Sequence, residues 1–249
     1  MPPPIRAPFF EFGPKTSLDR APLLEIVNAA RAASARYDVP VILTPPALDI
    51  EAVKRAAPEL WVFAQAMDIA SARASTGAIL ARALAAAGAD GVMLNHVERR
   101  LDERLLPDAV RQAHEAGLLT LLCADDVEQA TRYARWSPTL ILLEPPELIG
   151  TAHRDPRPWI GAADAAIAHV DPNVLVMHSG GIADEHDVRA LIAQGAAGTG
   201  CSTAIVRAAD PCDMTTRMIR AAREGWNDRN QTKEDPMAVS AVDAQGAAQ

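Results

Sequence analysis

The fold is decided by the stretch Thr139-Leu140-Ile141-Leu142-Leu143-Glu144-Pro145-Pro146-Glu147-Leu148-Ile149-Gly150-Thr151. Its first part is a run of mostly branched apolar side chains, which is typical of a strand buried on both faces of a parallel sheet. The two prolines that follow cannot donate hydrogen bonds to a neighbouring strand, so they end it. A carboxylate, that of Glu144, therefore stands at the carboxyl-terminal tip of a buried strand.

The segment after this strand has the pattern of a hinged flap. Residues 148–151 are short and apolar, include Gly150, and lead into a polar segment with two further prolines. A carboxylate beneath a flap that excludes water would have a raised pKa and could take a proton from carbon. Glu144 could equally cap a helix or pair with a cation, and this segment alone leaves both interpretations open.

The rest of the chain alternates short apolar runs with longer amphipathic segments. The runs predict strands at residues 9–12, 41–44, 60–64, 91–94, 118–122, 139–143, 173–177 and, weakly, 197–201. A helix is predicted after each strand: from residue 19 onward, over 50–57, 76–87, 104–116, 125–135, 159–170 and 184–195, and from residue 210 onward.

Eight such pairs predict an α/β protein with a single (β/α)8 barrel over residues 1–226. A doubly wound open sheet is the alternative, but no GxGxxG follows the first strand to support it. Residues 227–249 are polar with little apolar content, which predicts a disordered tail.

Composition narrows the class of protein. The 249 residues are 49% hydrophobic and 4% aromatic, which suits one large α/β domain, and the net charge of −8 argues against nucleic acid or an anionic membrane as partner. The amino terminus lacks a signal-peptide core, and no apolar run approaches the roughly 18 residues of a membrane span, so we expect a cytoplasmic protein. The three cysteines are scattered and lack zinc spacing, so neither a disulfide framework nor a metal site is expected.

Reactive side chains collect after the predicted strands, where a barrel places its chemistry. Glu144 could remove a proton next to a carbonyl, His96 could donate to the carbonyl oxygen, and Lys15 could hold the developing negative charge. Taken singly, His96 could be a structural histidine and Lys15 a solvated surface charge. The other residues singled out at strand ends are Gln65, Asn95, His178, Ser179, Gly180, Gly181, Ser202 and Thr203.

Three motifs together resemble the triosephosphate isomerase family in the short form typical of archaea: Lys15-Thr16, Asn95-His-Val-Glu-Arg-Arg100 and Glu144-Pro-Pro-Glu-Leu-Ile-Gly-Thr151. The resemblance runs from about Phe9 to about Arg223 and implies a TIM barrel. It implies an enzyme of glycolysis and gluconeogenesis that interconverts glyceraldehyde 3-phosphate and dihydroxyacetone phosphate through an enediolate, without a cofactor.

The resemblance also assigns roles to residues. Glu144 would be the catalytic base, His96 the neutral electrophile, Lys15 the substrate-binding cation and Glu98 a support for the loop that carries His96. The family is the standard example of a Glu base that acts with a neutral His, so these roles come from the resemblance. The family implies a homodimer or homotetramer in which the loop with Thr76 reaches the neighbouring subunit. The residues expected to bind the phosphorylated sugar are Gly13, Asn95, Ile149, Gly150, Gly180, Gly181, Ser202 and Thr203.

Several positions depart from the family pattern at the phosphate end of the site. Gly13 replaces an Asn, Ala152 a lid glycine, Ala183 a serine, and Thr203-Ala204 a Ser-Gly pair. Extra Cβ atoms hinder a phosphate cradle built from backbone N–H groups. His153, Arg154 and His178 could bind another anion or a larger polyol end, or could be ordinary residues without a role in binding.

Two alternatives to a triose phosphate isomerase stay open at this point. One is an isomerase of a related short sugar phosphate, such as a tetrulose phosphate. The other, from a different functional class, is a catalytically lapsed barrel homologue that serves as a binding or scaffold protein.

Overall fold

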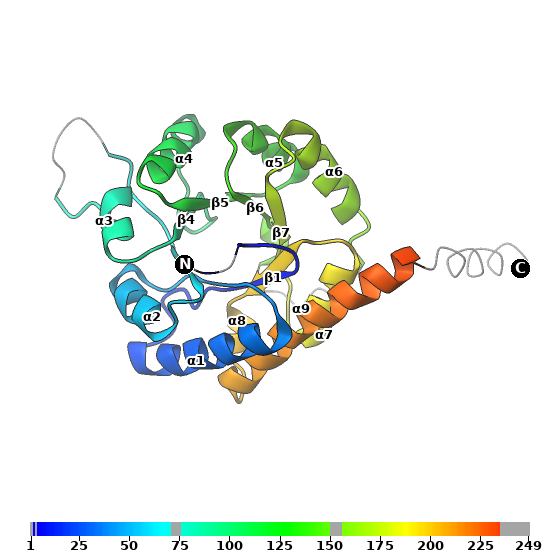
Figure 1. The fold of residues 1–249 in the computed structure, drawn as a ribbon. Helices are drawn as coiled ribbons and strands as arrows, with labels where there is room; N and C mark the ends of the chain where they lie inside the picture. Colours follow the sequence, from blue (N-terminus) through cyan, green and yellow to red (C-terminus); the bar gives the residue numbers. More distant parts are fainter. Residues whose placement is uncertain (1, 3, 71–75, 150–155, 235–249) are drawn as a thin grey trace, which may run out of the picture.

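The computed structural model describes residues 2, 4–70, 76–149 and 156–234, in which eight parallel strands close into a barrel (Figure 1). The strand order follows the chain, and β1 pairs with both β2 and β8. This closure confirms the predicted barrel and excludes the open sheet. The strands are β1 (Phe9–Phe12), β2 (Val41–Leu43), β3 (Trp61–Ala64), β4 (Gly91–Leu94), β5 (Leu119–Ala124), β6 (Leu140–Leu143), β7 (Leu175–His178) and β8 (Gly198–Cys201).

Helices surround the barrel and bury one face each against it (Figure 1). In the first helix, Leu23, Ile26, Val27 and Ala30 are buried at spacings of three and four residues, which is the period of one helix face. The helices are α1 (Arg20–Tyr37), α2 (Ile50–Ala56), α3 (Ala81–Ala86), α4 (Leu106–Glu115), α5 (Val127–Tyr133), α6 (Ile160–Val170), α7 (Glu185–Ala193), α8 (Thr203–Val206) and α9 (Pro211–Glu234).

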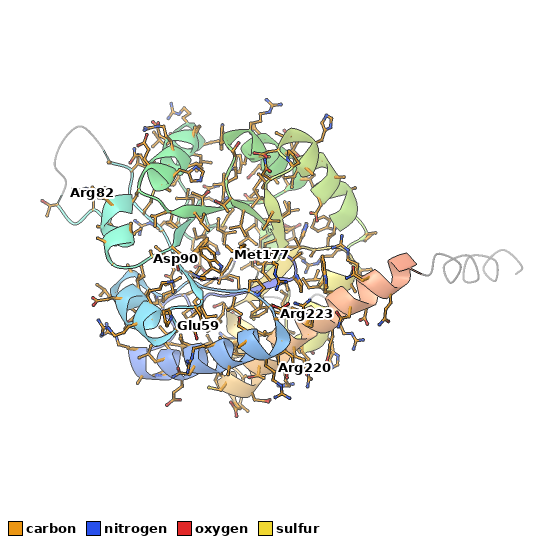
Figure 2. All side chains as sticks on the ribbon, viewed as in Figure 1. Glu59, Arg82, Asp90, Met177, Arg220 and Arg223 are labelled. Carbon is orange, nitrogen blue, oxygen red and sulfur yellow. The ribbon has the colours of Figure 1, made fainter. Side chains whose placement is uncertain are left out.

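The barrel interior is filled by large side chains that face glycines on other strands. A Cβ atom at Gly198 would lie 2.3 Å from the ring of Phe9, and one at Gly91 would lie 2.6 Å from the ring of Phe63. Met177, near the middle of the ring in Figure 2, completes this inner cluster. The interior of the barrel is therefore a packed core, and a reaction site can form only at the carboxyl-terminal ends of the strands.

The helix predicted over residues 76–87 is shorter in the structure, where α3 begins only at Ala81. Residues before it are held extended, because the backbone N–H of Asp68 donates to the carbonyl of Ile79 at 2.8 Å and the Asp68 carboxylate accepts from the Ile79 N–H at 2.8 Å. Alanine content favoured a helix here, but this pairing across the loop overrides it.

The last helix continues past the predicted domain boundary at residue 226. α9 packs against α1 and α7, and its polar carboxyl-terminal part is tied to α7. The Arg189 guanidinium lies 2.7 Å from the Asp228 carboxylate, and Arg229 donates to the Gly195 carbonyl at 2.7 Å. Residues 227–234 are thus helical rather than a disordered tail, and residues 235–249 lie outside the described residues.

No helix in the described part of the chain is long and apolar enough to cross a bilayer. Among the described residues, no cluster of three or more His, Cys, Asp or Glu side chains is arranged to hold a metal ion. All three cysteines are free thiols.

Candidate active site

A cavity of about 1160 Å³ opens at the carboxyl-terminal mouth of the barrel. It is bordered by the loops that follow the strands, where the sequence predicted the chemistry. The structure brings ten of the predicted site residues to its wall: Gly13, Lys15, His96, Glu98, Glu144, Ile149, Gly180, Gly181, Ser202 and Thr203.

Glu144 follows β6 and is largely buried, with 14% of its side chain exposed. Burial raises the pKa of this carboxyl, and the contact with the Ser179 hydroxyl opposes the rise. Its Oε2 lies 3.8 Å from Nε2 of His96, which comes from the loop after β4. A base of raised pKa and an imidazole from different strands therefore face each other in one cavity.

His96 has a defined tautomer. The backbone N–H of Glu98 donates to Nδ1 of the ring at 3.2 Å, so in the neutral imidazole the proton resides on Nε2, the nitrogen that faces Glu144. Burial lowers the pKa of His96, and the positive charge of Lys15 lowers it further. The ring is therefore a neutral hydrogen-bond donor at pH 7.

Lys15 is held in an unusual backbone conformation, with φ of 52° in the left-handed region. The side-chain amide of Gln65 donates to the Lys15 carbonyl at 2.9 Å and also to the Thr44 carbonyl at 2.9 Å, which fixes the turn after β1. The Lys15 ammonium lies 2.7 Å from Oε1 of Glu98, and this contact lowers the pKa of Glu98. Glu98 thereby connects the Lys15 side chain to the His96 loop.

The loop after β7 approaches Glu144 closely because residue 180 is glycine. Gly180 has φ of +82°, and a Cβ atom there would lie 2.9 Å from the Cβ of Leu148 and 3.4 Å from the Cγ of Glu144. Any side chain at this position would push the loop away from the carboxylate.

Arg157 holds the loop after β7 in place, and this role was not predicted from the sequence. It is 3% exposed, and its guanidinium donates to the Ser179 carbonyl at 2.8 Å and also to the Gly180 carbonyl. The only sequence signal was its place between Pro156 and Pro158, which favour an extended backbone.

Glu11 lines the cavity and, like Arg157, was not predicted from the sequence. It lies on β1, lines the cavity with only 6% of its surface exposed, and accepts a hydrogen bond from the Thr44 hydroxyl. Burial raises its pKa to about 8, although the Thr44 hydrogen bond acts in the opposite direction. A Cβ atom at Gly13 would lie 2.6 Å from Thr44 Oγ1 and 2.9 Å from Glu11 Oε1, so this pair fills the space of a residue-13 side chain.

Comparisons with known proteins agree with this geometry. The triosephosphate isomerase family model matches residues 15–221. The chain belongs to the triosephosphate isomerase family. It is 35% identical over 201 residues to the triosephosphate isomerase of Methanopyrus kandleri, covering 79% of this chain and 88% of the relative, and 33% identical to that of Methanosarcina acetivorans, covering 79% and 90%. The crystal structure of the Bartonella henselae enzyme shares the fold, with a TM-score of 0.71 and 18% identity over 88% of this chain and all of the other.

Within the triosephosphate isomerase family pattern, two departures have a structural context. At Gly13, the space of the expected side chain is taken by Glu11 and Thr44. At Ala183, the backbone N–H donates at 2.8 Å to the carboxylate of Asp187, which belongs to the capping box of α7. That N–H is committed to the helix start.

Asn95 was expected to bind substrate, but it does not line the cavity. The residue has φ of 61° and is 5% exposed. Its amide donates to the Cys123 carbonyl at 3.2 Å, and its Oδ1 accepts from the Leu101 N–H at 3.2 Å. Asn95 therefore satisfies one backbone group of β5 and one of its own loop, because the turn at the end of β4 directs its side chain away from the mouth.

The remaining predicted residues lie elsewhere. His178 is fully buried, with Nε2 2.7 Å from Asp164 of α6 and its ring against the edge of Trp159, so it is not exposed to bind an anion in the cavity. Thr76 is exposed and does not line the cavity of its own chain. Gly150, Ala152, His153 and Arg154 lie outside the described residues.

Proposed function

We propose that this protein interconverts D-glyceraldehyde 3-phosphate and dihydroxyacetone phosphate through an enediolate. Membership of the triosephosphate isomerase family supports this reaction. The single structural observation that supports it most is the 3.8 Å distance between Nε2 of His96 and Oε2 of Glu144 in the shared cavity. Two groups so placed can act on neighbouring atoms of one small substrate.

In the proposed reaction, Glu144 removes a proton from C1 of dihydroxyacetone phosphate. The electron pair forms the C1–C2 double bond, and the C2 oxygen becomes an oxyanion that receives a hydrogen bond from Nε2–H of His96. The Lys15 ammonium stabilises the negative charge. Glu144 then returns the proton to C2, while the proton of the C1 hydroxyl passes to the C2 oxygen by way of Nε2 of His96, which leaves an aldehyde at C1 and a hydroxyl at C2.

The phosphate of the substrate would lie toward the loops after β7 and β8. Gly180, Gly181, Ser202 and Thr203 line this part of the cavity, and Arg207 adds a positive charge to the same wall. Ile149 and Gly13 would contact the substrate closer to the reacting carbons. These substrate contacts are inferred from the corresponding positions of the triosephosphate isomerase family.

A coupled assay with dihydroxyacetone phosphate tests the proposal. We expect turnover by the wild type and a loss of several orders of magnitude in kcat for Glu144→Gln, since an amide cannot accept the proton. Glu147→Gln is the matched control, because Glu147 is exposed in the same segment and does not line the cavity. Turnover of a tetrulose phosphate without turnover of the triose phosphate would instead support the related isomerase, and no turnover of either would support a lapsed homologue.

We also propose that the protein is a cytoplasmic homodimer or homotetramer. The large apolar side chains exposed in the described residues are Leu48, Ile79 and Leu105, with 88%, 36% and 44% of their surfaces exposed. They come from the segments after β2, β3 and β4, which are neighbours in the barrel. Thr76 lies in the same region, so a second copy covering this face would also meet the Thr76 loop.

A further inference from the structure

Glu11 lines the same cavity as Glu144 but has no task in the reaction described above. In β1, Phe9-Phe10-Glu11-Phe12, Glu11 is the charged residue and the other three are phenylalanines. Because side chains alternate along a strand, Glu11 points toward the barrel interior on the same side as Phe9. A buried carboxyl is costly unless it is partnered or neutral. Its presence at the floor of the cavity therefore calls for a chemical explanation.

The two oxygens of this carboxyl have different surroundings. Oε1 accepts the hydrogen bond from the Thr44 hydroxyl and lies beside Gly13. Oε2 lies beside Gly200 of β8, where a Cβ atom would be only 2.7 Å away, and no hydrogen bond to it is found among the described residues. Because Gly13, Thr44 and Gly200 all line the cavity, Oε2 is the oxygen left to meet a bound molecule.

We propose that Glu11 is a neutral carboxylic acid that donates a hydrogen bond through Oε2 to an oxygen of the enediolate. This inference rests on the proposed isomerase function and adds a third donor to His96 and Lys15. The Glu11 proton stays on Glu11 throughout, so the proton balance of the reaction between Glu144 and the two substrate carbons is unchanged.

The electrostatic surroundings support a neutral acid at pH 7. Burial raises the pKa of Glu11 to about 8, the nearby charge of Glu144 raises it as well, and Thr44 and Lys15 act to lower it. The thiols of Cys123 and Cys201 also lie near Glu11, and burial raises the pKa of both. A carboxylic acid kept neutral in an apolar site is an effective donor to a developing oxyanion.

Ionisation of Glu11 would reverse its effect. The carboxylate has no proton to donate, and its charge would repel both the enediolate and the carboxylate of Glu144. We therefore expect kcat/KM of the wild type to fall as the pH rises through about 8, the pKa of Glu11 in the free protein.

The test compares wild type, Glu11→Gln, Glu11→Leu and Thr44→Val in the triose phosphate assay over a pH series. Glu11→Gln keeps a weaker, permanently neutral donor, so kcat should fall about tenfold with KM little changed, and the alkaline fall near pH 8 should vanish. Glu11→Leu has no donor and should lose about 10²-fold in kcat. Thr44→Val removes the hydrogen bond that lowers the pKa of Glu11, so it should move the alkaline fall to higher pH.

A binding measurement separates loss of the donor from misfolding. Each variant is checked by circular dichroism and thermal denaturation and is then titrated with 2-phosphoglycolate, a mimic of the enediolate. We expect Glu11→Leu to weaken this binding about tenfold or more while the KM for substrate changes little, because the donor acts on the charged intermediate. This result requires no turnover by the variant.

The outcomes distinguish the two proposals. A wild type that turns over the triose phosphate, with the same alkaline fall in Glu11→Gln or with unchanged kcat in a folded Glu11→Leu, overturns the role of Glu11 and leaves the isomerase function standing. A wild type that turns over no triose phosphate removes both.

Discussion

The neutral His96 ring depends on one backbone hydrogen bond and on burial, so it can be tested by a single substitution. His96→Gln keeps a hydrogen-bond donor of different geometry and strength, and we expect kcat to fall by about 10²–10⁴ with the fold intact. The control is His114→Gln on α4, because His114 does not line the cavity. Its Nε2 lies 3.3 Å from the Thr120 hydroxyl. Steady-state kinetics of both variants decide the matter: equal losses would mean that His96 acts only through the structure.

Glu11 also predicts how stability depends on pH. The folded protein holds the Glu11 proton up to about pH 8, whereas the unfolded chain releases it near the ordinary value of 4.5. A raised pKa in the folded state contributes stability that is fully present below the lower value and is lost as the pH rises through the upper one. We expect the Tm of the wild type to fall relative to Glu11→Gln between about pH 5 and pH 9.

Thermal denaturation of both proteins over this range measures the difference. The matched control is Glu25→Gln, which makes the same change of side chain at an exposed position of α1. A constant difference between wild type and Glu11→Gln would show that Glu11 ionises in the folded protein much as it does in the unfolded chain.

Individual site residues differ in how far the sequence reveals them. Glu144, His96 and Lys15 follow predicted strands, so the topology alone brings them to one mouth. Glu11 was passed over because an alternating strand gives no signal for which polar side chain reaches a cavity, although a carboxylate among phenylalanines was visible. Asn95 also follows a strand, but the direction of its side chain depends on its backbone φ of 61°. That angle is set by the turn after β4 and could not be read from the strand pattern.

The loop after β7 packs against Glu144 through Gly180, and Arg157 holds this loop in place through two of its carbonyls. Arg157→Lys keeps the positive charge but cannot donate to two carbonyls in the fork geometry of a guanidinium. A buried carbonyl left without its donor costs about 1–3 kcal/mol, so we expect a lower Tm together with a reduced kcat, because Gly180 packs against Glu144.

Arg111→Lys is the matched control, since Arg111 is an exposed residue of α4 that pairs with Asp108 and Glu115 on its own helix. Thermal denaturation and steady-state kinetics on both variants provide the comparison. If Arg157→Lys matched Arg111→Lys in Tm and kcat, the guanidinium would not be what positions the loop.

The elements themselves were predicted best where a period was long and uninterrupted. The strands were placed within a few residues, which is the usual uncertainty of element ends. Two helices differ more from their predicted lengths. α3 is shorter because Asp68 pairs with Ile79, and α9 is longer because Arg189 and Gly195, in and after α7, bind its polar residues. Both differences come from contacts between segments, which local composition does not contain.

For the molecule as a whole, the closed barrel leaves few large apolar side chains exposed in its described part, and these lie on one side. Leu48 is 88% exposed in the short 3-10 turn between β2 and α2, where an isolated chain would leave it in water. Burial of a leucine side chain contributes about 1.5–3 kcal/mol, and a symmetric interface uses each such residue twice. Leu48→Glu should therefore shift the protein from an oligomer to a smaller species or a monomer.

Light scattering after gel filtration over a range of protein concentrations measures this shift. The control is Asn28→Glu, which adds the same charge, because Asn28 is an exposed residue of α1 outside this group and its substitution should leave the mass unchanged. If the interface covers the mouth-facing loops, Leu48→Glu should also raise KM or lower kcat at concentrations where it dissociates, and recover at higher concentration. A wild type that is monomeric at every concentration, or a Leu48→Glu variant of unchanged mass, would remove this face as the interface.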